Sequence, residues 1–258
     1  KTLKTGIRFQ MIFKQLFTAL EFLTILPVPA ANWSEEEFGR SSVWYPLAGA
    51  ILGLAAASFF WLTRQFFPNS TAAVLTTIFW AVLTGGLHLD GFSDCCDGFF
   101  ASVTTEKRLQ IMKDPCHGTF AVLGLVLLIC CKITCIADLS GENDFLLFPL
   151  IASLGRLSIL AIIRLPLANP NGMAASLKKN VPPYALWAGA AAPLLLAVSL
   201  GWAGVVLILT ASLTVFTVSR LALAKIHGIN GDVLGMSVEL TEMVVLLAAS
   251  FLAGNLRP

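Results

Sequence analysis

Three aspartates, Asp90, Asp94 and Asp97, lie at positions i, i+4 and i+7 of one short segment. If this segment is helical, each residue turns by ~100°, and the three carboxylates fall within an arc of roughly 60°. Unneutralised carboxylates this close repel one another, and a divalent cation relieves the repulsion. Carboxylate oxygens suit Mg²⁺ or Mn²⁺, and Mg²⁺ commonly joins protein carboxylates to substrate phosphates. We therefore predict a Mg²⁺ site at these three aspartates, with Mn²⁺ as the alternative metal.

A second acidic group lies far along the chain, at Asp232, Glu239 and Glu242. The spacing of seven and then three residues again places the acids on one side of a helix. Glu239 and Glu242 are surrounded by apolar residues, and acids at membrane depth are costly and mark functional sites. We predict that Asp232 and Glu239 take part in substrate binding. Glu242 and Asp97 are the candidate general bases, and the sequence does not decide between them.

Five further polar residues complete the candidate site. His88 is a candidate catalytic base or metal ligand, although an interfacial histidine with its hydrogen bonds satisfied explains it equally well. Arg108, Lys113 and Asp114 lie in a short amphipathic stretch, where they either bind phosphate or form a solvated face. Arg156 lies in the middle of an apolar segment, where a guanidinium needs an acid or a phosphate as its partner. We predict phosphate or substrate binding for the last four.

The composition indicates which elements position these residues. Hydrophobic residues make up 57% of the 258 positions, charged residues 12%, and the mean hydropathy is +0.81. Soluble domains carry about 25% charged residues, so the chain belongs with integral membrane proteins. The net charge of +2 is too small to indicate a nucleic-acid partner. We predict one all-α integral membrane catalytic domain over 1–258, a polytopic bundle of transmembrane helices.

About seven segments are long enough to span a bilayer, which takes ~20 apolar residues. The helix of the second span is taken to continue through the aspartate motif. An amphipathic interfacial helix is predicted for Arg8 to Pro27, with a re-entrant or spanning helix as the competing possibility. The predicted spans are 43–63, 71–89, 117–138, 145–164, 183–200, 203–223 and 234–253.

The basic residues predict the orientation. With the N-terminus inside, 13 of the 17 Lys and Arg lie on the cytoplasmic side. Only Arg64 and Arg257 lie on the opposite side, and Lys132 and Arg156 lie within spans. The positive-inside rule then places the aspartate motif at the cytoplasmic face. We expect a multi-pass protein of the bacterial inner membrane whose active site faces the cytoplasm.

The two acidic groups and the metal ion that they are predicted to bind favour chemistry at phosphorus, in a protein embedded in the membrane. The chain has no Gly-x-Gly-x-x-Gly pattern and no P-loop. Metal ions held by oxygen ligands neutralise phosphate oxygens, and a nearby carboxylate can accept a hydroxyl proton. From the residues alone, the prediction is phosphotransfer on a substrate reached from the cytoplasmic leaflet.

The run GGLHLDGFSDCCDG at 85–98 resembles the signature of the cobalamin synthase family, the adenosylcobinamide-GDP ribazoletransferases. The resemblance extends through nearly the whole chain in the right order. Compared with the usual family pattern, Ser93 and Cys95 stand in place of Ala and Thr, and Pro115-Cys116 in place of Ser-Arg; every carboxylate is kept. The other matching segments are FLTILPVP at 22–29, YPLAG at 45–49, LQIMKD at 109–114, Arg156, and GDVLG at 231–235 followed by Glu239 and Glu242.

The resemblance implies a reaction that joins adenosylcobinamide-GDP to α-ribazole or α-ribazole 5′-phosphate. The products would be adenosylcobalamin, or its phosphate, and GMP. The resemblance does not settle which acid has which role. Our mechanistic hypothesis is that Mg²⁺ on the three aspartates grips the diphosphate, while Arg108, Lys113 and Arg156 neutralise phosphate oxygens. The expected partners are these substrates and membrane lipid. A homo-oligomer, or a complex with other enzymes of the corrinoid pathway, is left open.

Two other classes are alternatives to this family. CDP-alcohol phosphotransferases also carry spaced aspartates at a membrane helix end, but their pattern has Ala-Arg after Asp-Gly. Here Gly98 is followed by Phe99 and Phe100, and there is no Asp-x3-Asp pair beyond Asp90 and Asp94. A cation-coupled transporter would show acids near the midplane of several spans and repeated halves. Here the acids gather at cytoplasmic ends, and no internal repeat is found.

Overall fold

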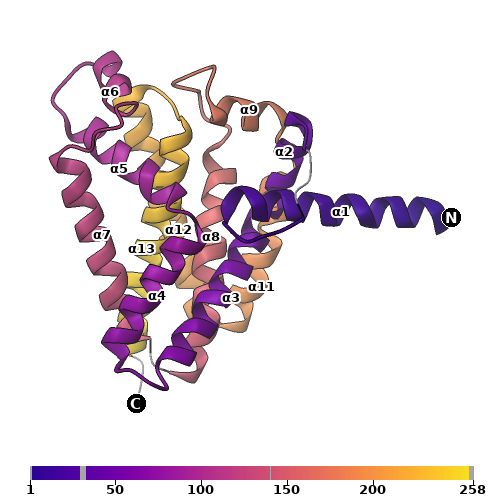
Figure 1. Ribbon diagram of the computed structural model, residues 1–258, viewed down its shortest axis with the longest axis vertical. Helices are drawn as coiled ribbons and strands as arrows, with labels where there is room; N and C mark the ends of the chain where they lie inside the picture. The colour runs from indigo at the N-terminus through magenta and orange to yellow at the C-terminus, as the bar shows by residue number, and fades with distance from the viewer. Residues whose placement is uncertain (1, 30–32, 140, 256–258) are drawn as a thin grey trace.

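The computed structural model describes residues 2–29, 33–139 and 141–255. Regular structure in these ranges is helical, apart from one isolated bridge between Leu167 and Ile229, which confirms the predicted all-α class. Most of the helices form an upright bundle, while α1 projects sideways from it (Figure 1). The elements, with η for 3-10 helices, are α1 (Thr2–Leu23), α2 (Glu35–Ser41), η1 (Ser42–Trp44), α3 (Tyr45–Thr63), α4 (Asn69–Leu83), α5 (Leu87–Phe100), α6 (Thr105–Ile111), α7 (Thr119–Asp138), η2 (Glu142–Leu146), α8 (Leu147–Ile162), α9 (Met173–Asn180), α10 (Ala185–Gly189), α11 (Ala191–Ser199), α12 (Trp202–Ile226) and α13 (Gly231–Asn255).

Within the described ranges, five continuous helical stretches are long and apolar enough to cross a membrane. Two bent pairs, α4 with α5 and α9 with α10 and α11, raise the number to seven if each counts as one span. The chain is therefore a multi-pass membrane protein with five to seven candidate spans, against a predicted count of about seven. The five stretches are Glu35–Thr63, Thr119–Asp138, Asp144–Ile162, Trp202–Ile226 and Gly231–Ala253.

The helix of the second predicted span, 71–89, was expected to continue through the aspartate motif, and this prediction is wrong. Helix α4 ends at Leu83, and α5 leaves it at an angle of 93°. Gly85 and Gly86 form the turn with φ of 60° and 71°, a left-handed conformation that glycine adopts without steric cost. Hydropathy does not detect this turn because apolar residues stand on both sides of it. The turn directs α5 away from the apolar span, so we treat α5 as lying outside it.

Helix α8 forms the centre of the bundle, since nearly all its side chains are buried. Helix α3 packs against it at Gly49, where a Cβ atom would come within 2.4 Å of the Ala152 carbonyl oxygen. Small residues of this kind let the backbones of membrane helices approach closely. Helix α13 packs against α5, α7 and α8 and so connects the core to the aspartate motif.

The N-terminal helix α1 runs across the long axis of the bundle rather than along it (Figure 1). It is joined to the next elements by an ion pair from Lys14 Nζ to Glu37 Oε1 at 2.5 Å, and by a hydrogen bond from Trp44 Nε1 to Gln15 Oε1 at 3.2 Å. This orientation does not resemble a bundle span. An interfacial position for α1 stays a prediction.

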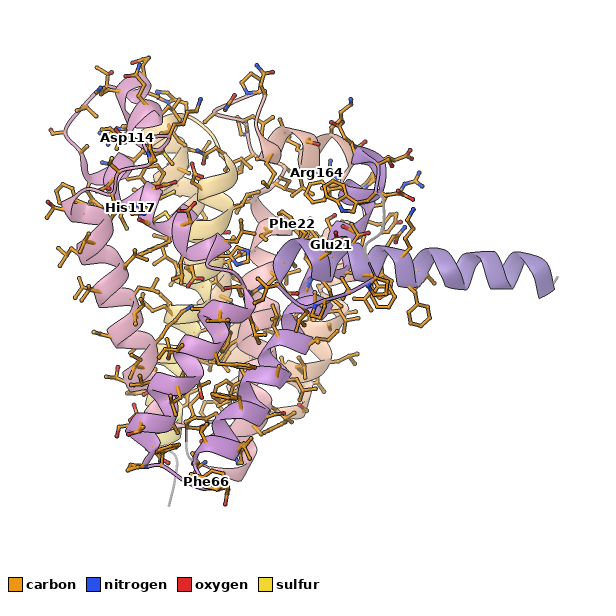
Figure 2. The ribbon with its side chains drawn as sticks, in the orientation of Figure 1. Glu21, Phe22, Phe66, Asp114, His117 and Arg164 are labelled. Atoms are coloured by element: carbon orange, nitrogen blue, oxygen red, sulfur yellow. The ribbon has the colours of Figure 1, made fainter. Side chains whose placement is uncertain are left out.

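The two ends of the bundle differ in chemistry. Asp114, His117 and Arg164 lie at the broad end and Phe66 at the narrow end (Figure 2). Helices α5, α6 and α9 also lie at the broad end, which we call the site end (Figure 1). Arg64, predicted for the opposite side, follows α3 next to the turn that holds Phe66. Arg257, the other basic residue predicted for that side, lies outside the described residues.

Candidate active site

Helix α5 presents its three aspartates on one face, as their spacing predicted. The opposite face is buried and includes His88, Phe92 and Cys95. Asp90 is exposed, whereas Asp94 and Asp97 are half-buried. The predicted arc is preserved because all three aspartates lie within α5, beyond the glycine turn.

A fourth carboxylate, Asp232, joins this face from the first turn of α13. The two helices touch at Gly91, where a Cβ atom would lie 2.9 Å from Asp232 Cα. Burial raises the pKa of Asp94 to about 7, and the negative charges of Asp232, Asp90 and Asp97 add to the rise. Carboxylates predicted from two distant segments therefore meet at one place.

These helices border a cavity of about 340 Å³, which we call the acidic cavity. Since one water needs only ~10–15 Å³ on this measure, the cavity has room for a diphosphate. The lining contains both polar and apolar residues. The polar lining residues are His88, Asp90, Lys113, Asn169, Asn230 and Asp232, and the larger apolar ones are Phe22, Met112, Ile159, Met173, Leu177 and Leu234.

The third aspartate of the motif, Asp97, contacts the start of α7. Its Oδ2 accepts the Gly118 N–H at 2.5 Å, and its Oδ1 accepts the Ala121 N–H at 2.9 Å. A carboxylate is favoured at this position because the first turn of a helix exposes unpaired N–H groups and a partial positive charge. Asp97 thus caps α7 and positions the segment after α6. Its predicted roles in metal binding and catalysis stay predictions.

The basic residues after the motif have different surroundings. Arg108 Nη1 donates to the carbonyl oxygens of Gly98 and Phe99 at 2.7 and 2.8 Å, so its guanidinium caps the C-terminal end of α5. Lys113 is exposed and lines the acidic cavity, where its charge acts on Asp232. Asp114 is exposed and accepts the N–H of Cys116. Among the three residues of this stretch, Lys113 is the one that lines the acidic cavity.

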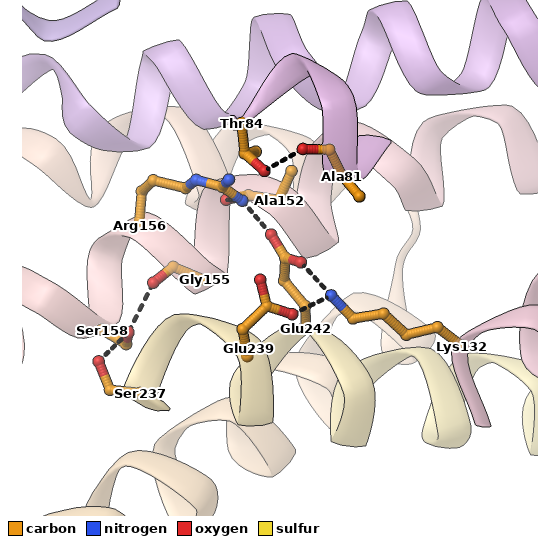
Figure 3. Close-up of polar contacts among 10 residues, drawn as sticks. All are labelled: Ala81, Thr84, Lys132, Ala152, Gly155, Arg156, Ser158, Ser237, Glu239 and Glu242. Carbon is orange, nitrogen blue, oxygen red and sulfur yellow. Dashed lines mark hydrogen bonds and ion pairs between the residues drawn. The ribbon is translucent and has the colours of Figure 1, made fainter. Parts of the chain in front are cut away.

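Arg156, Glu239 and Glu242 form a separate group deeper in the bundle, together with Lys132 (Figure 3). Lys132 Nζ donates to Glu239 Oε2 at 2.5 Å and to Glu242 Oε2 at 2.7 Å. Arg156 Nη1 donates to Glu242 Oε1 and, at 3.4 Å, to the Ala152 carbonyl oxygen. We call these four side chains the buried charge cluster. Two positive and two negative charges balance, and each residue is at most 8% exposed.

Arg156 is therefore not a lone guanidinium, because the acid it was predicted to need is Glu242. Its Nε and Nη2 atoms, however, have no hydrogen-bond partner among the described residues. Asp232, on the other hand, lies at the acidic cavity and apart from Glu239 and Glu242, although all three lie on α13. The second acidic group is thus divided between two places.

His88 lies between the acidic cavity and the buried charge cluster. It lines the cavity and is 3% exposed, and the charges of Arg156 and Lys132 act on it. Its Nδ1 atom has no hydrogen-bond partner among the described residues. The histidine with satisfied hydrogen bonds that the sequence left open is therefore not observed.

The carboxylates at the cavity are the residues that could hold a divalent cation. Among the described residues, no group of three or more His, Cys, Asp or Glu has the spacing of a complete metal site. Mg²⁺, however, is usually held by one or two carboxylates together with waters and substrate phosphates. Asp90 and Asp232 line the cavity, and Asp94 is close enough for their charges to act on it, so a cation held there would neutralise part of this negative charge.

A family model described as cobalamin-5-phosphate synthase matches residues 15–250. The chain belongs to this family. The matched range contains every candidate site residue, from His88 to Glu242. The family resemblance predicted from the motifs is confirmed.

Curated relatives are similar in sequence to this chain over nearly its full length. The adenosylcobinamide-GDP ribazoletransferase of Pseudomonas aeruginosa is 37% identical over 242 residues, which cover 91% of this chain and 97% of that protein. The protein of the same name from Chlorobaculum tepidum is 36% identical over 246 residues, covering 93% of this chain and 96% of that protein. The one from Prosthecochloris aestuarii is 32% identical over 243 residues, with 92% and 97% covered. No solved structure matches the chain.

Three polar residues of the acidic cavity and the buried charge cluster were not predicted as site residues, namely Lys132, Asn169 and Asn230. Lys132 carried a clear signal, because a charge within a span is costly and marks a functional or structural partner. Asn169 and Asn230 lie in segments that hydropathy treats only as connections. Asn230 directly precedes a helix, where asparagine is a preferred cap, so its position had a weaker signal.

Proposed function

We propose that this chain joins adenosylcobinamide-GDP to α-ribazole, or to α-ribazole 5′-phosphate, at the acidic cavity. A ribose hydroxyl of the ribazole attacks the phosphorus that carries the aminopropanol arm of the corrinoid. A new oxygen–phosphorus bond forms, the bond from that phosphorus to the GMP oxygen breaks, and GMP leaves. The transferase activity follows from family membership, since the curated relatives carry the name adenosylcobinamide-GDP ribazoletransferase.

The observation that carries the choice of site is the meeting of Asp90, Asp94 and Asp232 beside Lys113. Carboxylates do not attract phosphates, so their concentration at one cavity supports a cation between them and the diphosphate. Asp90 and Asp94 on α5, together with Asp232 on α13, would hold Mg²⁺. The bound metal would neutralise the diphosphate oxygens and stabilise the leaving phosphate.

Lys113 is the protein cation placed to contact phosphate oxygens, because it is exposed and lines the cavity. Arg108 and Arg156 support the site in a different way. Arg108 holds the end of α5 through two backbone carbonyls, and Arg156 neutralises Glu242 within the bundle. A cation beside the phosphates, such as Lys113, stabilises the transition state because negative charge moves to the leaving group during the reaction.

We assign the hydroxyl proton to the imidazole of His88. The ring lines the cavity, and its Nδ1 has no partner among the described residues. A neutral imidazole nitrogen without a hydrogen-bond partner can accept a proton from a hydroxyl within its reach. Asp97 and Glu242, the other candidate bases, each have both oxygens engaged by hydrogen bonds or ion pairs.

The acidic cavity is proposed to face the cytoplasm of a bacterial cell, from the inner membrane. Helix α6 carries Lys107 and Arg108, α9 carries Lys178 and Lys179, and both helices lie at the site end (Figure 1). An excess of Lys and Arg in short connections is typical of cytoplasmic loops. Soluble nucleotide-linked substrates would reach the cavity directly from this side.

The site is tested with Asp232→Asn in purified protein reconstituted in lipid. Several kcal/mol of charge stabilisation at the metal correspond to a loss of about 100-fold or more in kcat/KM. Asp138→Asn is the matched control, because Asp138 is an exposed carboxylate at the other end of α7 whose Oδ2 accepts a hydrogen bond from Ser250. GMP release is measured over a range of Mg²⁺ concentrations. Full activity of Asp232→Asn, with an unchanged Mg²⁺ requirement, would contradict the proposed site.

A further inference from the structure

We infer that Asn230 is a positioning residue, which holds the Asp232 carboxylate in place at the acidic cavity. Its side-chain Nδ2 donates to Asp232 Oδ2 at 2.7 Å. Asn230 itself lines the cavity but was assigned no role by the sequence. This inference rests on the proposed metal-holding function of Asp232.

The same side chain caps α13. Asn230 Oδ1 accepts the Val233 N–H at 3.0 Å, and the Asn230 carbonyl oxygen accepts the Leu234 N–H at 3.3 Å. This is the usual arrangement of a helix N-cap residue, whose side chain satisfies an unpaired N–H of the first turn. The amide therefore uses its oxygen for the helix and its nitrogen for Asp232.

The backbone just before Asn230 is held firmly. The Ile229 N–H donates to the Pro166 carbonyl oxygen at 2.8 Å, and the Ala168 N–H donates to the Ile229 carbonyl oxygen at 2.9 Å. These bonds form the one bridge between the segments that follow α8 and α12. With its backbone and its Oδ1 both anchored, the Asn230 amide nitrogen has a defined position relative to Asp232.

The positioning matters because of the charge around Asp232. The carboxylate of Asp90 acts on it unfavourably, and Asp94 is affected by the same group of charges. Without this donor, we expect repulsion from Asp90 to favour positions of the Asp232 carboxylate farther from α5. A hydrogen bond to a charged group is worth more than one between neutral groups, so a single amide can hold it.

The substitution Asn230→Ser separates the two roles of the amide, which are to cap α13 and to donate a hydrogen bond to Asp232. Asparagine and serine are similarly good N-caps, so Asn230→Ser keeps a cap for α13. Serine, however, has a single polar atom on a shorter side chain, so a hydroxyl that caps the helix is expected to hold Asp232 less well than the amide nitrogen does. Asn230→Ala removes both the cap and the donor. Asp232→Asn serves as the reference for loss of the carboxylate itself.

The readout is direct binding of Mn²⁺, followed by electron paramagnetic resonance of the free ion, to purified protein in lipid nanodiscs. Titrations are made with the metal alone and with fixed GDP as a diphosphate probe. Asn230→Ser is expected to weaken Mn²⁺ binding about tenfold or more, the loss that corresponds to one hydrogen bond to a charged group. Its melting temperature is expected to match that of the parent, whereas Asn230→Ala lowers both.

Two results overturn the inference, and they differ from each other. If Asp232→Asn weakens Mn²⁺ binding but Asn230→Ser binds as the parent does, Asn230 only caps α13, and the proposed metal site stands. If Asp232→Asn binds Mn²⁺ as the parent does, the metal role of Asp232 fails, and the inference fails with it.

Discussion

Replacing Lys132 by methionine removes one positive charge from the buried charge cluster and leaves a side chain of similar length. The parent cluster is neutral, with Lys132 and Arg156 balancing Glu239 and Glu242. After the change, one positive charge faces two negative ones. Lys132 Nζ lies 2.5 Å from Glu239 Oε2 and 2.7 Å from Glu242 Oε2, so both carboxylates lose a partner.

The size of the effect follows from burial. Glu239 and Glu242 are 3% and 1% exposed, so water does not replace the lost ammonium. Breaking a buried ion pair by removing one partner costs ~3–5 kcal/mol, because the remaining charge is buried and uncompensated. We expect Lys132→Met to lower the free energy of unfolding by about this amount.

A compensating change isolates the role of charge. The double variant Lys132→Met/Glu239→Gln keeps the ion pair between Arg156 and Glu242 and restores neutrality. It loses buried hydrogen bonds but leaves no uncompensated charge, so its expected cost is ~1–2 kcal/mol. Lys179→Met is the control, since this exposed lysine should change stability by no more than about 0.5 kcal/mol.

Stability is measured by titrating the purified variants with SDS in mixed micelles and following helix content by circular dichroism. The double variant must unfold at a higher SDS fraction than Lys132→Met alone. If Lys132→Met costs less than ~1 kcal/mol, or if the double variant is the less stable of the two, the charge argument is refuted.

Three further changes test the α5 region. Asp94→Asn should lower GMP release about 100-fold or more while leaving the circular dichroism spectrum unchanged, and full activity would remove Asp94 from the metal site. Gly86→Ala places a Cβ at φ 71°, which costs ~1–2 kcal/mol. Since a Cβ there meets nothing within 4 Å, a lower melting temperature with kcat preserved is expected, and loss of kcat would contradict this. Asp97→Asn loses the charge that caps α7, so the melting temperature should fall by the equivalent of about 1 kcal/mol, and an unchanged value would disprove the cap.

Much of the site was predictable from residue spacing alone. The face shared by Asp90, Asp94 and Asp97 depends only on the helical repeat, so it was recovered even though the helix begins at an unexpected turn. The multi-pass class was equally clear from hydropathy. Motif order then predicted the family, which the match over residues 15–250 confirms.

Spacing could not reveal which charges meet across helices. Asp232, Glu239 and Glu242 share one helix, yet Asp232 meets the acidic cavity and the two glutamates meet Lys132. That division depends on how α13 crosses α5 and α7, which is a matter of tertiary packing. Lys132 was identified as a charge within a span, but its partners lie more than 100 positions away in the chain.

The turn between α4 and α5 was missed for a different reason. Leucines stand on both sides of the turn, at Leu83 before it and at Leu87 and Leu89 after it, so hydropathy averaged over a window extends the span across the turn. The pair Gly85 and Gly86 carried the relevant signal, since adjacent glycines mark turns.

The most direct test of the account is turnover by the purified parent protein in lipid, supplied with adenosylcobinamide-GDP and α-ribazole. The account predicts one GMP released for each cobalamin product formed, in the presence of Mg²⁺ and not after its removal by a chelator. Turnover that continues unchanged without a divalent metal would contradict the proposed metal site. Release of GDP in place of GMP would contradict attack at the phosphorus that carries the aminopropanol arm.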